Sequence, residues 1–250
     1  GSHVVRSLHG VRRLKIFMGD EPMFDRFHQE AIQQDSGLHD FCGVTVDREE
    51  GQRARVRLEA ARIDSGTEQA LTTGEADLAI GYLPWLGGAI ATQPLYEQDW
   101  VCLASPRHPR VRERLGRRRY AAEGHVSITA GTGATLLHRA LTTQGIERRV
   151  VLELPGFLGL GAIIGGTDLL ATLPRHIGTT LARGNDLALW PCPLPVERFE
   201  VGQYWHPRFD NEPGSRWLRD LVAELFGSLS PAAGTTSLPR PPAGPPGDRT

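Results

Sequence analysis

The sequence predicts an α/β fold that consists of two similar lobes. Segments 71–84 and 165–174 carry the same pattern: a helical run reaches glycine, an acidic residue follows, and an apolar run ends at proline. Glycine ends helices because it adopts the left-handed conformation without strain, and short aliphatic runs suit parallel strands that are buried on both faces. A helix–turn–strand unit that occurs twice therefore predicts two lobes, with a cleft between them for a ligand.

Composition limits the classes of function. A formal net charge of −1 argues against a surface whose main role is to hold nucleic acid, because phosphate binding requires a basic excess. No apolar run reaches about 18 residues, so we expect no membrane-spanning helix and no membrane partner. Cys42, Cys102 and Cys192 are too far apart for a CxxC metal site, and we expect structural thiols in a reducing, cytoplasmic compartment.

Both ends of the chain are expected to lie outside the fold. Residues 1–10 join a Gly-Ser-His start, typical of a cleaved purification tag, to a linker, so we expect the natural protein to extend further upstream. Residues 228–250 consist mainly of Ser, Ala, Gly and Pro. Such a segment cannot bury enough apolar surface to offset the entropy of ordering, which predicts a disordered tail.

The first half of the chain predicts a strand at 13–18, a turn at 19–22 and a helix at 23–34, for which Asp20 can serve as N-cap. Residues 38–52 are polar and resemble an insertion, with a short apolar piece that suits one arm of a hairpin. We expect a helix at 65–73, with Ser65 and Glu68 in a capping-box pattern. The other strands of this half are expected at 53–60, 78–80, 90–95 and 100–104.

In the second half, a strand at 125–129 leads through the loop 130–133 into a helix that runs to about residue 143. The last helix, at 216–225, carries its apolar residues on one face. The remaining elements are expected strands at 148–154, 169–173, 187–190 and 199–205 and expected helices at 157–164 and 176–183.

No set of catalytic residues stands out. The glycines of segment 159–165 resemble a dinucleotide fingerprint, but three residues separate them from the preceding strand, and no carboxylate follows the next strand to bind a ribose. No two histidines are spaced four residues apart on a helix, as a helical metal site would require. We therefore expect no enzyme activity, no cofactor and no metal.

Two strand-to-helix turns favour ligand binding. The turns at 19–21 and 130–133 place backbone N–H groups at helix N-termini, which attract anionic or polar groups, although simple capping explains Asp20 equally well. Ligands of open α/β sheets lie beyond the carboxyl ends of the strands. The predicted ligand-binding residues are Asp20, Glu21, Gly81, Tyr82 and Tyr204 in the first lobe and Gly131, Thr132, Gly133 and Phe157 in the second.

The order of five segments resembles the effector-binding domain of LysR-type transcriptional regulators. These segments are RLKIFMGD, EADLAIGYLP, LYEQDWVCLASPRHP, TDLLATLP and QYWHPRFDNEPGSRWLRDLV, and the resemblance covers residues 12–226. The ending W-H-x-x-F-x-x-x-P-x-x-x-W-L-R, from Trp205 to Arg219, is similar to the branch of the family that senses aromatic compounds and flavonoid-like inducers. The chain differs from this branch at Gly156 and Ala134, where some members have ligand-contacting histidines, so the sequence does not identify the effector.

The resemblance implies two Rossmann-like subdomains of periplasmic-binding-protein (type 2) architecture. Subdomain I would comprise residues 11–95 and 198–227 and subdomain II residues 96–197, joined by crossover strands. It also implies a small-molecule effector, either aromatic or carboxylate-bearing, a homodimer or homotetramer, and an upstream winged helix-turn-helix that binds DNA. Two alternative classes of protein share the two-lobed architecture: an extracytoplasmic solute-binding protein, and an enzyme on the same fold.

Overall fold

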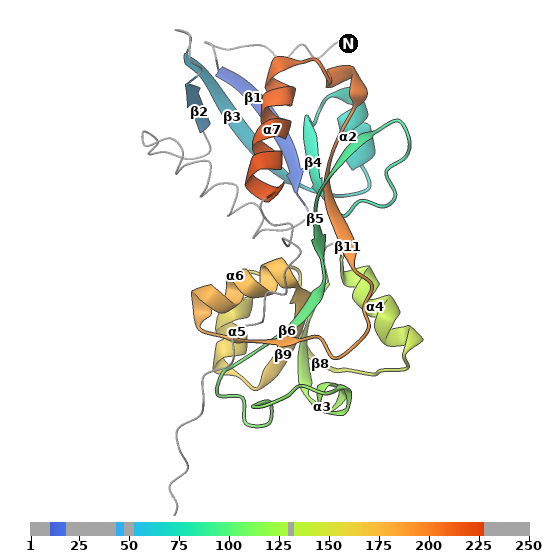
Figure 1. The fold of residues 1–250 in the computed structure, drawn as a ribbon, viewed down its shortest axis with the longest axis vertical. Coiled ribbons are helices and arrows are strands. Elements are labelled where there is room, and N and C mark those ends of the chain that lie inside the picture. The colour runs from blue at the N-terminus through green and yellow to red at the C-terminus, as the bar shows by residue number, and fades with distance from the viewer. Residues whose placement is uncertain (1–10, 19–43, 48–52, 130–132, 228–250) are drawn as a thin grey trace, which may run out of the picture. The chain divides into compact units, whose positions relative to one another are not determined.

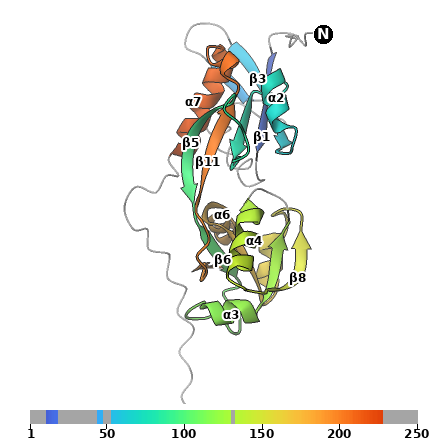
Figure 2. The ribbon, with the colours of Figure 1, turned by 90° about the vertical axis from the view of Figure 1, so that its right-hand side faces the viewer.

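The computed structural model describes residues 11–18, 44–47, 53–129 and 133–227. The chain divides into two compact units (Figures 1 and 2). Among the described residues, unit 1 contains those up to residue 97 together with 200–227, and unit 2 contains 98–199. The helix expected at 23–34 and most of the insertion expected at 38–52 lie outside the described residues. The expected termini, 1–10 and 228–250, also lie outside them.

Unit 1 contains a six-stranded mixed sheet in the order β2-β3-β1-β4-β11-β5. Strand β1 pairs in parallel with β3 and β4, whereas β11 is antiparallel to β4 and β2 is antiparallel to β3. The strands of this sheet are β1 (Val11–Met18), β2 (Val44–Asp47), β3 (Arg53–Arg62), β4 (Leu78–Gly81), β5 (Ala91–Gln98) and β11 (Phe199–Trp205). The helices of unit 1 are α2 (Thr67–Thr73), the 3₁₀ helix η1 (Pro207–Phe209) and α7 (Pro213–Gly227).

The helices α2 and α7 cover opposite faces of β11. Tyr204 packs against the cluster that α2 forms with β4, which includes Leu71 and Ala79. The neighbouring Gln203 is fully buried, and its amide donates to the carbonyl of Arg219 in α7. Because successive side chains of a strand point to opposite faces, these two contacts place the helices on different sides of the sheet.

The segment from Trp205 to Arg219, which carries part of the resemblance, has a structural role at the corner between β11 and α7. The buried guanidinium of Arg219 donates to Ser215 Oγ (2.8 Å) and to the carbonyl of Asp210 (2.9 Å). It lies 4.7 Å from the ring centroid of Trp205, whose indole N–H donates to the Asp210 carboxylate. Hydrogen bonds and a cation–π contact therefore hold this corner together.

Unit 2 contains a five-stranded mixed sheet in the order β10-β6-β9-β7-β8. Strand β7 pairs in parallel with β8 and β9, whereas β6 is antiparallel to both β9 and β10. The strands are β6 (Trp100–Ala104), β7 (Gly124–Ile128), β8 (Arg149–Leu154), β9 (Leu169–Pro174) and β10 (Ala188–Pro191). The helices are α3 (Arg117–Ala122), α4 (Gly133–Thr143), α5 (Leu160–Gly166) and α6 (Arg175–Asn185).

The apolar core of unit 2 lies between the sheet and helices α5 and α6. Helix α6 approaches β6 closely at Gly178, where a Cβ atom would lie 2.5 Å from Val101 Cγ2. Glycine is therefore required at this position by the close approach of helix and strand. The buried members of this core are Leu103, Val126, Leu160, Ile164, Ala171, Leu173, Ile177 and Leu187.

The capping box predicted for α2 is wrong. The helix begins at Thr67, and its N-cap, Gly66, has no side-chain cap. The Asp64 carboxylate accepts a hydrogen bond from the Gly66 N–H (2.8 Å), and Thr67 Oγ1 accepts one from the Asp64 N–H (3.0 Å). These local bonds form the turn before the helix, so Ser65 is not needed as a cap.

Several expected boundaries also differ, among them those of β5 and α5. Strand β5 continues through the polar residues 97 and 98, beyond residue 95, at which the expected strand ends. In the second helix–strand unit, Gly165 and Gly166 both lie within α5. The helix is capped by Thr167, which has an extended backbone and whose hydroxyl donates to the carbonyl of Ile163 (2.7 Å). Gly74 alone follows the predicted pattern, because it caps α2 in the left-handed conformation with φ of 80°.

We predict that Gly74→Ala lowers the free energy of unfolding by about 1–3 kcal/mol, because alanine is strained in this conformation. The new Cβ would also lie 2.8 Å from Phe209 Cζ. Chemical denaturation measures the loss. Gly88→Ala is the matched control, since no atom lies within 4 Å of a Cβ at that position. Equal effects of the two substitutions would contradict this account of Gly74.

Candidate functional site

Three of the predicted ligand-binding residues lie close together in unit 1. Gly81 ends β4 and pairs with Gly202 of β11, and Tyr204 pairs with Ala79 two positions along the same ladder. Tyr82 follows Gly81 directly in the sequence. Burial raises the pKa of Tyr204, and the charges of Glu200 and Tyr82 act in the same direction. We call Gly81, Tyr82 and Tyr204 the tyrosine group.

The Tyr204 phenol lies near Thr92, and hydrogen bonding to the backbone of Leu83 and the side chain of Thr92 acts against the rise in its pKa that burial causes. Gly202 makes this geometry possible, because a Cβ there would lie 3.1 Å from the carbonyl oxygen of Gln93 and 3.4 Å from Tyr204 Oη. The half-buried ring of Tyr204 packs against the cluster of α2 and β4.

In unit 2, predicted residue Gly133 begins α4 and rests on aromatic residues. A Cβ at Gly133 would lie 3.4 Å from Trp100 Cη2, 3.8 Å from Phe199 Cζ and 3.9 Å from Pro174 Cγ. The rings of Trp100 and Phe199 are tilted by 54° with centroids 5.7 Å apart, and the Trp100 indole donates to the carbonyl of Glu197 (3.0 Å). We call the rings of Trp100 and Phe199, together with the adjacent Pro174, the aromatic floor.

Phe157 belongs to a different part of unit 2. It packs against the core under α5 and α6, and its carbonyl accepts a hydrogen bond from the N–H of Leu160 (3.1 Å). The described contacts therefore do not join Phe157 to Gly133. The other predicted ligand-binding residues, Asp20, Glu21, Gly131 and Thr132, lie outside the described residues, so their roles stay predictions.

Sequence reasoning missed the aromatic floor. Trp100 and Phe199 each begin a strand, β6 and β11, and each follows a polar stretch at a crossing between the two units. Within an apolar strand an aromatic residue suggests ordinary core. One feature of the sequence could have identified them. Both residues lie where the chain crosses between the two units, and the resemblance implies crossover strands at these positions.

The N-terminus of α6 is occupied by protein groups. The Arg175 guanidinium binds the Asp99 carboxylate through Nε–Oδ1 (2.5 Å) and Nη2–Oδ2 (2.6 Å), and the Arg175 N–H donates to the Asp99 carbonyl. The next N–H, that of His176, donates to the side-chain oxygen of buried Gln98 (3.1 Å). These bonds fix the start of β6 to the helix and satisfy the first two N–H groups of α6.

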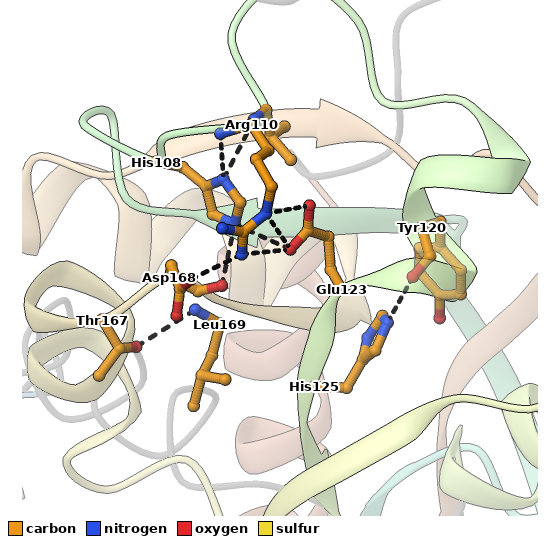
Figure 3. A network of polar contacts seen from close by, with 9 residues as sticks. His108, Arg110, Tyr120, Glu123, His125, Thr167, Asp168 and Leu169 are labelled. Carbon is orange, nitrogen blue, oxygen red and sulfur yellow. Dashed lines mark hydrogen bonds and ion pairs between the residues drawn. The ribbon is translucent and has the colours of Figure 1, made fainter.

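A charged network at the start of β9 also has all of its charges paired (Figure 3). Arg110 forms a fork with the buried carboxylate of Glu123, with distances of 2.9 Å from Nε to Oε1 and 2.7 Å from Nη2 to Oε2. The same guanidinium reaches Asp168 Oδ2 (2.6 Å) and lowers the pKa of that carboxyl. The network fixes the segment before α3 against β9.

His108 completes this network in one defined tautomer (Figure 3). Its Nδ1 accepts hydrogen bonds from the N–H groups of Arg110 (3.2 Å) and Val111 (3.0 Å). The proton of the neutral ring is therefore on Nε2, which donates to the carbonyl of Asp168 (2.9 Å). Every polar atom of the ring is engaged in the structure, which argues for a structural histidine rather than a base.

A second buried histidine, His125, is poorly suited to carry a charge. Its Nε2 lies 2.7 Å from the carbonyl of Tyr120, the two rings meet edge to face, and within the described part of the chain Nδ1 has no hydrogen-bond partner. Burial lowers its pKa to about 4, and the positive charge of Arg148 contributes. His125 is therefore neutral near pH 7.

Among the described residues, no group of three or more His, Cys, Asp or Glu side chains could hold a metal ion. Helices of the described segments are all too short or too polar to cross a membrane.

The two mixed sheets have the periplasmic-binding-protein (type 2) arrangement, which is the fold of a ligand-binding domain. The family described as the LysR substrate binding domain matches residues 48–227, which include strands and helices of both units. The chain belongs to this family and is the effector-binding domain of a LysR-type regulator.

Two relatives are activators of transcription. The chain is 36% identical over 159 residues to the HTH-type transcriptional activator NahR of Pseudomonas putida, a match that covers 63% of this chain and 53% of the relative. It is 30% identical over 178 residues to the HTH-type transcriptional activator NagR of a Ralstonia species, covering 70% and 59%. The chain thus spans little more than half the length of these relatives.

A solved structure has the same fold. The regulatory domain of MexT, a transcriptional activator in Pseudomonas aeruginosa, superimposes with a TM-score of 0.65 at 22% identity. The superposition covers 86% of this chain and 99% of that structure. The predicted fold class and the predicted family are therefore confirmed.

We predict that the neutral state of His125 makes the domain less stable in acid. Its folded pKa lies below the unfolded value of about 6.5, so the unfolded chain binds the proton first as pH falls. Between pH 7.5 and pH 5 this residue should remove about 2 kcal/mol of stability, and the loss should be complete near its folded pKa.

Denaturant unfolding at several pH values tests this prediction. His125→Gln should be less sensitive to pH than the wild type, whatever its stability at pH 7.5. The exposed His138→Gln on α4 is the control and should follow the wild type. An unchanged pH dependence in His125→Gln would show that this ring does not cause the loss.

Proposed function

We propose that this chain is the sensing half of a bacterial transcription regulator that responds to a small effector, either aromatic or carboxylate-bearing. The observation that carries the proposal is the family match across residues 48–227, shared with relatives that are HTH-type transcriptional activators. In the whole protein, an upstream winged helix-turn-helix would bind DNA. Such a regulator would act in the cytoplasm.

The side chains support a small ring as effector. Unit 1 offers two tyrosines, Tyr82 and Tyr204, and unit 2 offers a helix start that rests on the aromatic floor. Aromatic walls with few polar groups suit a small ring, and a helix N-terminus suits a carboxylate. The proposed contacts include Tyr82 and Gly81 in unit 1 and Gly133 in unit 2. Asp20, Glu21, Gly131, Thr132, Phe157 and Tyr204 remain part of the proposal.

Effector binding changes DNA binding only if the effector has different affinities for two arrangements of the whole protein. The proposal therefore requires that effector binding changes the affinity for DNA by the same factor as DNA binding changes the affinity for the effector.

The two alternative classes are less well supported. A solute-binding protein shares the fold, but the relatives with the highest identities reported above are activators of transcription. An enzyme would need a nucleophile, a base and an orienting group close together. The two buried histidines of Figure 3 instead have structural environments.

Calorimetry with three simple probes tests the ligand chemistry. Benzoate combines a ring with a carboxylate, phenol retains only the ring, and cyclohexanecarboxylate retains only the acid. We expect benzoate to bind the wild-type chain more tightly than either of the others. Tyr82→Ala and Thr132→Val should each weaken benzoate binding by about tenfold to a hundredfold.

Tyr96→Phe is the matched control, because it keeps the ring that stacks on Phe226 at 6.3 Å in the core of unit 1. Thermal melts must show that all variants are folded. If none of the three probes binds, the proposed ligand class is wrong. If both site variants bind benzoate like the wild type, the proposed site is wrong.

We predict that the chain alone does not bind duplex DNA with sequence selectivity, because its net charge is near neutral. The polypeptide extended upstream should do so, as gel shifts at several salt concentrations would reveal. A sequence-selective gel shift by these 250 residues alone would contradict the proposal that DNA binding belongs to an upstream domain.

Self-association is also part of the proposal. Members of the family commonly pair side by side. The helix expected at 23–34 and the helix at 216–225 are proposed to contribute to a homodimer, or to a homotetramer in the whole protein. Light scattering that detects only monomer at tens of micromolar would count against it.

A further inference from the structure

Positive charge is concentrated in one segment of unit 2, residues 107–122, which we call the arginine segment. It contains seven arginines and one glutamate, a formal charge of +6, whereas the whole chain has a formal charge of −1. All seven arginines are exposed. The large apolar side chains of the segment, Val111, Leu115 and Tyr120, are all buried. The segment therefore packs through its apolar side chains and presents its guanidinium groups to solvent.

Two of the seven arginines attach the segment to the rest of unit 2. The Arg110 guanidinium is bound by the carboxylates of Glu123 and Asp168 (Figure 3). Arg117 Nη2 donates to the carbonyl of Gln144 (2.8 Å), directly after α4. These bonds hold the segment in a defined conformation, so its remaining guanidinium groups start from fixed positions on the backbone.

The other five arginines have no acidic partner among the described residues. One of them, Arg118, lies two positions before buried Tyr120 in α3, which at 100° per residue places it on the opposite face of the helix. We call these five exposed and unpaired arginines the basic surface: Arg107, Arg112, Arg114, Arg118 and Arg119.

The basic surface and the start of α4 lie at opposite ends of the parallel strands of unit 2. Helix α3 directly precedes β7, and Asp168, to which Arg110 binds, directly precedes β9. Strands β7 and β9 are parallel, so both contacts are at their amino ends. Helix α4 instead follows the carboxyl end of β7 (Figure 1). A partner of the basic surface therefore does not compete with an effector at the start of α4.

The chemistry of the arginine segment favours phosphate groups as the partner. A guanidinium group donates two parallel hydrogen bonds to phosphate oxygens and keeps its charge at all relevant pH values. A protein partner requires an apolar interface core, from which charged residues are depleted, and a membrane surface requires apolar anchors. The large apolar side chains of this segment are buried and supply neither.

We propose that the basic surface binds the phosphate backbone of duplex DNA without regard to base sequence. The choice of DNA rests on the function proposed above, in which an upstream domain holds the chain on DNA. A duplex carries one negative charge per about 1.7 Å of its axis, so several arginines can each meet a phosphate. Phosphate contacts carry no sequence information, which agrees with the lack of selectivity predicted for the chain alone.

Fluorescence anisotropy of two labelled duplexes of unrelated sequence tests the proposal on the full chain of 250 residues. At low salt we expect the chain to bind both duplexes equally, with a dissociation constant of about 10–100 µM. The affinity should fall steeply as the salt concentration rises, because bound arginines release counterions from the DNA.

The double variant Arg114→Gln/Arg118→Gln removes two charges from the basic surface. It should weaken DNA binding at low salt by at least about fivefold, and lower the slope of log affinity against log salt by about 2. The matched control is Arg139→Gln/Arg183→Gln, which removes two exposed arginines of α4 and α6 and leaves the same net charge. It should bind within about twofold of the wild type. Arg114→Lys/Arg118→Lys keeps both charges and should keep the wild-type salt slope.

Thermal melts establish that each variant is folded. The proposal is overturned if neither duplex binds at low salt, if one sequence is preferred, or if the site and control variants weaken binding equally. Binding to vesicles of anionic phospholipid without binding to DNA would also overturn it. Benzoate calorimetry is a separate test of the effector site. A chain that binds benzoate but no DNA contradicts only this inference, and one that binds DNA but none of the three probes contradicts only the proposed effector class.

Discussion

The hydrogen bond from the Trp100 indole to the carbonyl of Glu197 connects the two passages of the chain into and out of unit 2. Trp100 begins β6, the first strand after the chain enters, and Glu197 lies two residues before Phe199, at which β11 begins and the chain leaves. The two aromatic rings add a tilted contact, and the Arg175–Asp99 fork holds the same strand start. A partly buried hydrogen bond and an aromatic pair contribute about 1 kcal/mol each, so this junction is fixed by several modest contacts.

This junction matters because each sheet depends on a strand from a distant part of the sequence. In unit 2, β6 pairs with β9 and with β10, which lies more than eighty residues later. In unit 1, β11 returns from the far end of the chain to pair with β4 and brings Tyr204 beside Gly81 and Tyr82. The tyrosine group therefore forms only when the second crossing is in place. The start of α4 likewise rests on residues from both crossings.

The two faces of the unit 2 sheet have different chemistry, which follows from the alternation along β6 and β9. Leu103 and Ala171 face the apolar core under α5 and α6. Cys102 and Thr172 point the other way, toward the Tyr120 hydroxyl, which lies 2.9 Å from Thr172 Oγ1. The Cys102 thiol thus lies on the polar face, 3.6 Å from Thr172 Oγ1.

Much of the architecture was predictable because it depends on local patterns. The apolar runs of β4 and β9 and the left-handed Gly74 could be identified in the sequence, and the order of such segments indicated the family. The α2 capping box failed because Asp64 and Thr67 compete with Ser65 for the same turn, which composition does not reveal. Trp100 and Phe199 could not be assigned to a site, because an aromatic residue in a strand is compatible with ordinary core until its tertiary neighbours are known.

The central claim is that effector binding involves the start of α4 on its aromatic floor. The most direct measurement is the indole N–H signal of Trp100 in a ¹H–¹⁵N spectrum during titration with benzoate, assigned by its absence in Trp100→Phe. The account predicts a saturable shift of this signal, at the concentration where calorimetry detects binding. Saturable binding that leaves the Trp100 signal unmoved would contradict it.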